Sequence, residues 1–158
     1  MNRFLSFVVL TALLFTASAC SAKKPPEQAA VRSKNVLTAL RSINRAYEKK
    51  DLAAFMFDVA QNYPDRNALS SALATVFSKY ETIHFNIQYS KMLIMVDENG
   101  RARASFNWDA ELLATGGTTQ KNGARVTMVF EPGTFKLLSI DGKNPFVPQP
   151  AEMPGAKQ

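Results

Sequence analysis

The chain has 158 residues, a formal net charge of +6 and a single cysteine. A chain of this length holds one compact core and its extensions, not several domains. One cysteine excludes an intramolecular disulfide, and no His, Cys, Asp and Glu group has the spacing of a metal site, so we expect no metal or other cofactor. Lysine and arginine are scattered through the chain, which argues against nucleic acid as a partner.

The N-terminus has the three-part pattern of a secretory signal peptide. Arg3 precedes an apolar run from Phe4 to Phe15, and small residues follow. The run is shorter than the roughly 20 apolar residues that a membrane-spanning helix needs. We therefore predict that residues 1–19 are an export signal that is removed.

Two patterns overlap at the predicted cleavage point before Cys20. Ala17-Ser18-Ala19 satisfies the small-x-small rule of ordinary signal peptidase. Ser18-Ala19-Cys20 resembles the lipobox of bacterial lipoproteins, with Ala17 at the position where that family usually has Leu. The resemblance implies acylation of Cys20 by chains such as palmitate, and two or three chains would anchor the protein stably in the membrane. Simple cleavage before Cys20 is the alternative.

Ser21 indicates which of the two membranes would hold the anchor, since enteric lipoproteins retained at the inner membrane carry Asp at that position. The resemblance thus favours the periplasmic face of the outer membrane. Residues 20–30 would be a short polar tether, held semi-extended by Pro25-Pro26. Residues 149–158 are Pro-rich with little apolar content, so we expect a disordered tail.

Three amphipathic helices follow the tether. The first ends at Glu48, and apolar residues at spacings of three and four predict its buried side. That stripe comprises Val36, Leu37, Leu40, Ile43, Asn44 and Tyr47. Asp51 and Asp65 are expected to cap the second and third helices.

From Thr82 to Ile140 the pattern changes to the period of two that is typical of strands. The alternating runs are residues 83–89, 102–110 and 126–130. Asn99-Gly100 lies between two strand segments and predicts a hairpin. Helices followed by an antiparallel meander indicate an α+β domain over residues 31–148, with the helices packed on the sheet.

Three stretches of this domain resemble the nuclear transport factor 2-like superfamily, also called cystatin-like, which includes polyketide cyclases. They are Ala46-Tyr47-Glu48 at the end of the first helix, Asp51-Leu52 at the start of the second, and the strand from Ala104 to Ala110. The resemblance implies a strongly curved, cone-like sheet that wraps the first helix. It also implies a homodimer packed sheet to sheet.

Enzymes of that superfamily, such as isomerases and dehydratases, carry an Asp, Tyr or His among apolar residues inside the cone, where burial shifts the pKa of such a group. Here the inward parity of the strands carries no charge. His84 has the outward parity, and Asp58 lies off its apolar stripe. We therefore predict no catalytic residues, and an isomerase, dehydratase or hydrolase remains the alternative.

An apolar ligand is one interpretation of the interior. Trp108 lies on the inward parity beside small alanines, which would leave room against the indole. The alternative is that Trp108 simply fills the core. The predicted ligand-pocket residues are Tyr47, Tyr89, Phe106, Trp108, Met128 and Phe130.

Residues 92–96 are apolar at both parities. If Asn99-Gly100 forms a two-residue turn, Val96 pairs with Arg103, and Met92, Ile94 and Val96 lie on the outer face as a homodimer surface. A bulged turn would shift the register by one and bury them instead. Together the patterns predict a lipid-anchored envelope protein whose non-catalytic domain binds an apolar ligand or a protein partner. A purely structural assembly module is a further alternative.

Overall fold

The computed structural model describes residues 26–147. The predicted signal peptide, Cys20 and the tail over residues 149–158 lie outside the described residues. The first helix, α1, spans Pro26–Glu48. It begins within the predicted tether, because proline fits the first turn of a helix, where its missing N–H is not needed. None of the helices described between residues 26 and 147 is long and apolar enough to cross a membrane.

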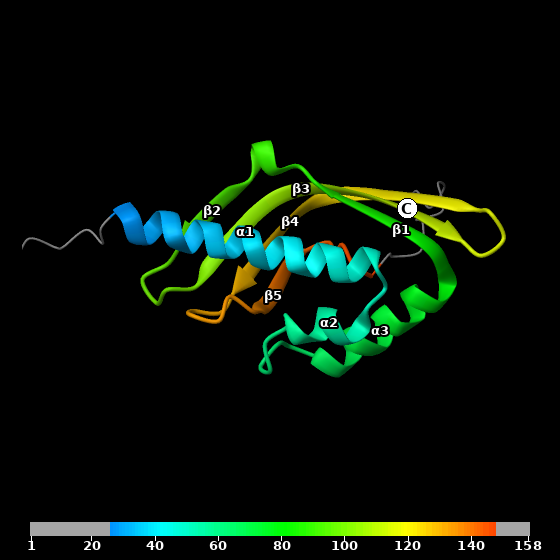
Figure 1. Ribbon diagram of the computed structural model, residues 1–158, viewed down its shortest axis with the longest axis horizontal. Coiled ribbons are helices and arrows are strands. Elements are labelled where there is room, and N and C mark those ends of the chain that lie inside the picture. The colour runs from blue at the N-terminus through cyan, green and yellow to red at the C-terminus, as the bar shows by residue number, and fades with distance from the viewer. Residues whose placement is uncertain (1–25, 148–158) are drawn as a thin grey trace, which may run out of the picture.

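Two short helices follow, α2 over Leu52–Phe57 and α3 over Arg66–Lys79. Asp51 caps α2 as predicted, since its Oδ1 accepts a hydrogen bond of 2.9 Å from Ala54 N. Asp65 precedes α3 with left-handed backbone angles and accepts no capping bond, so the second predicted cap is wrong. Figure 1 shows α1 running along the sheet, with α2 and α3 grouped below it.

The second half of the chain forms a five-stranded antiparallel sheet. Its strands are β1 Tyr80–Ile87, β2 Leu93–Val96, β3 Ala102–Ala114, β4 Thr119–Phe130 and β5 Leu137–Gly142. The order is β1-β3-β4-β5, and β2 pairs with β3 beyond the end of β1. A 3₁₀ turn, η1 over Tyr89–Lys91, separates β1 from β2. These two strands therefore form consecutive halves of one edge of an open sheet (Figure 1).

The turn between β2 and β3 is longer by one residue than the predicted two-residue turn. Asp97 N donates to Arg101 O over 2.9 Å and Gly100 N donates to Asp97 O over 3.0 Å. Gly100 has a positive φ of 79°, which a non-glycine side chain rarely adopts. This is a three-residue loop with a glycine bulge. Val96 accordingly pairs with Ala102, not with Arg103.

One residue of register reverses the two faces of β2. Ile94 pairs with Ala104, whose side chain is buried, so Ile94 and Val96 pack against the core. Met92 also packs there. The predicted placement of Met92, Ile94 and Val96 on the outer face is therefore wrong. The outward apolar residues of β2 are Leu93 and Met95, each 50% exposed.

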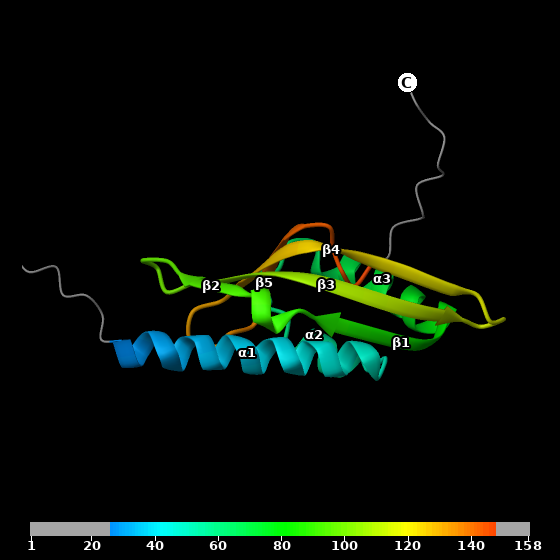
Figure 2. The same cartoon turned by 90° about the horizontal axis from the view of Figure 1, so that it is seen from above.

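The core lies between the helices and the concave face of the sheet. Figure 2 shows α1 beside the strands as a separate layer. The predicted helix stripe is buried at Val36, Leu40, Ile43 and Tyr47. The sheet contributes the residues that parity placed inward, namely Ala102, Ala104, Phe106, Trp108, Ala110, Val126, Met128 and Phe130. The predicted α+β class and the packing of helices on one face are confirmed.

Candidate functional site: the interior and the β1–β2 edge

An aromatic cluster fills the interior where the sequence suggested a pocket. Phe146, from the segment after β5, is 1% exposed. Its ring centroid lies 4.8 Å from that of Phe55 and 5.1 Å from that of Tyr47. Phe85 stacks on Trp108 at 5.6 Å and lies 5.5 Å from Phe146. Such contacts add to the free energy of burying the rings, so the cluster is a stable centre of the domain.

Five of the six predicted pocket residues lie in this core. Tyr47, Phe106, Trp108, Met128 and Phe130 are all buried. Tyr47 and Trp108 both contact the ring of Phe85. Tyr89 lies apart on η1, 40% exposed, with the Arg41 guanidinium 5.9 Å from its ring centre. Phe55 and Phe146 complete the cluster. Alternation within a strand could not predict that Phe55 and Phe146 join the cluster, because Phe55 lies on a short helix and Phe146 follows the last strand.

The interior offers few polar groups. Tyr47 Oη donates to Phe146 O over 3.2 Å, and burial together with nearby Tyr80 raises the pKa of Tyr47 well above its usual range. Trp108 Nε1 and Asn44 Oδ1 are buried without a hydrogen-bonding partner among the described residues. These groups can donate or accept a hydrogen bond. A phenol held this firmly protonated is a poor general base at neutral pH.

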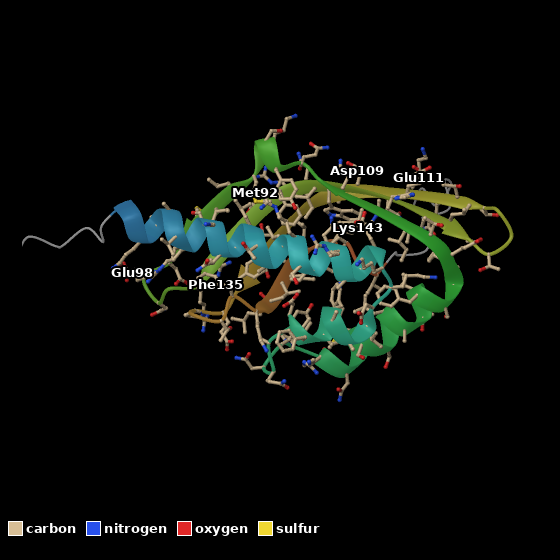
Figure 3. The ribbon with its side chains drawn as sticks, in the orientation of Figure 1. Met92, Glu98, Asp109, Glu111, Phe135 and Lys143 are labelled. Atoms are coloured by element: carbon tan, nitrogen blue, oxygen red, sulfur yellow. The ribbon has the colours of Figure 1, made fainter. Side chains whose placement is uncertain are left out.

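The acids and the histidine lie outside the core. His84 is exposed on β1, and Asp58 is half-buried at the end of α2, where its carbonyl accepts from Leu137 N. Asp109 and Glu111 project from the side of β3 away from the helices (Figure 3). Apart from buried tyrosine and tryptophan side chains, Ser105 is the only buried polar residue within residues 26–147, and no three metal-ligating side chains gather there. The described interior therefore holds no carboxylate or imidazole for acid–base chemistry.

Three surface hollows lie outside the aromatic cluster, and the six predicted pocket residues line none of them. One of about 290 Å³ lies between α3 and the C-terminal segment, next to Leu69 and Val147. Two others, of about 170 Å³ and 370 Å³, share Arg32 near the start of α1. The larger of these two reaches the β2–β3 turn at Glu98 and the β4–β5 turn at Phe135, both labelled in Figure 3.

The outer face of the sheet combines an apolar strip with polar neighbours. Leu93 and Met95 stand beside Ser105 and Arg103 of β3. Ser105 Oγ and Thr127 Oγ1 lie 2.7 Å apart, and Arg103 forms an ion pair of 3.4 Å with Asp141. We define the outer strip as Leu93 and Met95. It is the most exposed apolar surface on the described strands.

Side chains at the end of α1 seal the middle of the β1 half of the sheet edge, at Phe85. Phe85 N donates to Glu48 Oε1 over 2.9 Å, and Phe85 O accepts from Asn44 Nδ2 over 3.2 Å. Lys50 Nζ donates to Tyr80 O over 3.0 Å at the start of the strand. The last turns of α1 and the residues directly after it thus supply side chains to some of the backbone groups that an edge strand would otherwise leave unpaired.

The β2 half of the edge is open. No described residue hydrogen-bonds to the backbone of Ile94 or Val96 on the side away from β3. Here α1 does not seal the strand: a hollow of about 170 Å³ is lined by Arg32 and Ala29 of the helix and by Val96. A short apolar strand with an unpaired edge is a template for pairing with another chain. The β2 edge and the outer strip are therefore the candidate functional site.

Sequence comparisons identify no relative: no family model matches the chain, and no curated protein matches it. Structure comparison does find similar folds. A nuclear transport factor 2-like superfamily protein from Salmonella enterica serovar Typhimurium has a TM-score of 0.63 at 14% identity, covering 81% of this chain and 96% of its own.

Two further solved structures agree. A pinacolase from Penicillium brevicompactum has a TM-score of 0.57 at 11% identity, covering 69% of this chain and 82% of its own. A conserved protein from Planctomyces limnophilus has a TM-score of 0.59 at 11% identity, covering 70% of this chain and 94% of its own. The chain has the nuclear transport factor 2-like fold that the sequence resemblance implied.

Proposed function

We propose that this nuclear transport factor 2-like fold serves as a non-catalytic, lipid-anchored module that binds a protein partner in the bacterial envelope. The single observation that carries the proposal is the contrast between the filled interior and the open surface. Phe146 occupies the centre of the aromatic cluster, whereas Leu93 and Met95 expose apolar surface beside an unpaired strand edge. A filled core favours partner binding over pocket chemistry, because a small substrate needs a concave site.

The anchor is supported by the sequence. The proposal places two or three acyl chains on Cys20 after removal of residues 1–19, with the domain on the periplasmic face of the outer membrane. Only five residues separate Cys20 from the start of α1 at Pro26 in the sequence, and so short a linker would hold the domain close to the lipid surface. Lys23 and Lys24 fall in that interval and favour contact with anionic headgroups.

Membrane fractionation tests the anchor. We expect wild-type protein in the outer-membrane fraction, and Cys20→Ala in the soluble fraction with its far-UV circular dichroism unchanged, because the anchor and the fold are separate. Ser21→Thr, which keeps a hydroxyl directly after the cysteine, is the matched control and should stay with the membrane. An unacylated native N-terminus would contradict the proposal.

A small apolar ligand is the second candidate, and two observations favour it. Trp108 Nε1 is buried without a partner among the described residues, and the plugging residue Phe146 belongs to no helix or strand. Withdrawal of Phe146 would open a space against Tyr47 and Phe55. An isomerase-like enzyme has less support, because no described interior carboxylate or histidine could serve it. The pinacolase shares the fold at 11% identity, and a shared fold at that identity does not assign its activity to this chain.

Mass spectrometry of protein purified from its native membrane separates the two candidates. The partner-binding proposal expects the acylated chain with no bound small molecule. It also expects no change in the fluorescence of Trp108, the only tryptophan, when fatty acids are added at micromolar levels. A stoichiometric apolar ligand, or probe binding that quenches Trp108, would replace partner binding with ligand binding.

A further inference from the structure

The open half of the sheet edge has a sequence that is complementary to itself. Lys91, Ile94 and Asp97 are evenly spaced, three residues apart, around the four-residue strand β2. We propose that β2 pairs antiparallel with β2 of a second copy of this chain, about a two-fold axis at Ile94. The inference deepens the proposed function by naming one partner, and rests on the part of it that assigns the domain to protein binding.

The direction of each backbone group follows from the turn. Asp97 and Arg101 form a hydrogen-bonded pair, and such pairs alternate along an antiparallel ladder. Met95 and Leu93 therefore direct their N–H and C=O groups toward β3. Ile94 and Val96 direct theirs to the open edge. Met92 adds only its C=O, because its N–H is donated to Tyr89 O over 3.2 Å.

This pattern permits few antiparallel registers. The outward-directed residues must face each other, so the two-fold axis passes through residue 93, 94 or 95. An axis at Ile94 joins Ile94 to Ile94 of the second copy by two backbone bonds. Val96 N then donates to Met92 O of the second copy, and the symmetric bond forms in return. Each copy thus satisfies both of its free strand amides.

Charge selects the register centred on Ile94. That register places Lys91 opposite Asp97 of the second copy, and symmetry repeats the pair at the other end. An axis at residue 95 instead sets Lys91 opposite Asn99, and one at residue 93 sets it opposite Met95. Neither Lys91 nor Asp97 forms an ion pair with a residue in the range 26–147. Lys91 ends η1, one residue before Met92, so it lies next to the strand pair and not within it, and its long side chain can reach Asp97 of the second copy. Opposite charges brought together across a strand pair stabilise it, so this register has the best match.

The side chains agree with the same register. Leu93 falls opposite Met95 of the second copy on the outer face, so the two outer strips meet side by side across the strand pair. These are the two residues that are 50% exposed in the single chain. On the inner face Met92 falls opposite Val96 of the second copy. An extended peptide of another protein would use the same backbone groups, but it would not reproduce the two symmetric charge pairs.

Sedimentation velocity with charge-swapped chains tests the proposal. The full chain carrying Cys20→Ala is the reference and should form a dimer as its concentration rises. In Lys91→Glu, each Glu would face Asp97 of the second copy, and in Asp97→Lys, each Lys would face Lys91. Each variant alone should dimerise about 10- to 30-fold more weakly, because two attractive pairs become repulsive.

Mixing the two variants gives the decisive result. In a mixed dimer Glu at 91 faces Lys at 97, and Lys91 faces Asp97, so both pairs are attractive again. The mixture should recover the dimer, predominantly as the heterodimer. Glu98→Lys makes the same charge change as Asp97→Lys one residue along, where no partner is placed, and is the matched control. It should weaken the dimer far less than Asp97→Lys.

Asp97 also supports its own turn, because its Oδ1 accepts from Arg101 N over 2.9 Å. If Asp97→Lys unfolds, Asp97→Asn keeps an acceptor at Oδ1 and removes the charge, and it should weaken the dimer less than Lys91→Glu does. A reference chain that stays monomeric at every concentration overturns the proposal. The proposal is also overturned if Lys91→Glu leaves the dimer affinity unchanged, or if mixing the two variants does not restore the dimer. Membrane fractionation of Cys20→Ala reports on the anchor independently, so failure of the dimer proposal does not imply failure of the anchor proposal, or the reverse.

Discussion

The two halves of one sheet edge differ in how their outward backbone groups are hydrogen-bonded. Along β1, the side chains of Asn44 and Glu48 from α1 bond to the backbone of Phe85. Along β2, the backbone groups of Ile94 and Val96 have no such partner among the described residues. The last turns of α1 therefore cover the edge of the sheet at Phe85, and they also contribute Tyr47 to the aromatic cluster.

Packing follows the same division. Beneath the sealed half, Phe85 stacks on Trp108 and meets Tyr47 edge to face, with ring centroids 5.6 Å and 5.7 Å apart. On the open half, Leu93 and Met95 contribute little to the core, because half of each residue's surface is in solvent. The aromatic contacts of the core therefore lie beneath the β1 half. The β2 half retains exposed apolar surface and unpaired backbone, which are the properties of a binding edge.

The largest expected effect comes from breaking the sealed half. Phe85→Ala removes a ring that contacts Tyr47, Trp108 and Phe146, and should lower the free energy of unfolding by about 3–5 kcal/mol. Met95→Ala, on the open half, should change it by less than about 0.5 kcal/mol in the monomer. Urea unfolding of the two variants measures both values. Equal losses would remove the distinction between the halves.

A smaller effect is expected from unsealing β1 without touching the core. Glu48→Ala leaves Phe85 N without its acceptor, and should cost about 1–2 kcal/mol in urea unfolding. Lys49→Ala changes the exposed neighbouring residue and is the matched control, with a loss under about 0.5 kcal/mol. If Glu48→Ala behaves like Lys49→Ala, the bond from Phe85 N to Glu48 adds nothing to the stability of the domain.

The smallest of these effects concerns Tyr47 and alkaline pH. Burial raises the pKa of Tyr47 above its usual value of 10.0, so the folded chain holds the phenol proton more tightly than the unfolded chain. The resulting stability is complete below about pH 10 and is lost as pH rises above that value. Tyr47→Phe removes the bond to Phe146 O, which should cost about 1 kcal/mol near pH 7.

Tyr47→Phe should also flatten the fall in stability between about pH 9 and about pH 11, measured as the urea midpoint. Tyr63 supplies the control, because burial raises its pKa as well while it lies outside the aromatic cluster. Tyr63→Phe should reduce the slope less. An unchanged slope in Tyr47→Phe would mean that the phenol of Tyr47 ionises equally in the folded and unfolded chains.

Much of the fold can be predicted because period and parity are local properties. The helix stripe through Val36 and Tyr47 and the inward positions of β3 through Trp108 follow from spacing alone. The first half of β4 is harder, because Thr119 to Asn122 are all polar and the two small residues Gly123 and Ala124 follow, so no apolar alternation marks it. The burial of Phe146 depends on a segment of no regular structure meeting α1 and α2, which no local pattern encodes.

The location of the candidate site depends on a difference of one residue in the length of the β2–β3 loop. The sequence Asp97 to Arg101 is compatible with a two-residue turn or with a three-residue loop, and only the backbone of Gly100 distinguishes them. Because side chains alternate with a period of two, the wrong turn exchanges the whole inner face of β2 for its outer face. An apolar outer surface on this strand therefore exists, but Leu93 and Met95 form it.

Amide hydrogen exchange measured by NMR at several protein concentrations tests the contrast between the sealed and open halves most directly. The amide of Phe85 should be protected equally at every concentration, because Glu48 of the same chain accepts its hydrogen bond. The amides of Ile94 and Val96 should exchange rapidly in dilute monomer and become protected as the dimer forms. If Ile94 and Val96 are as protected as Phe85 in dilute monomer, or stay unprotected in the dimer, the account is wrong.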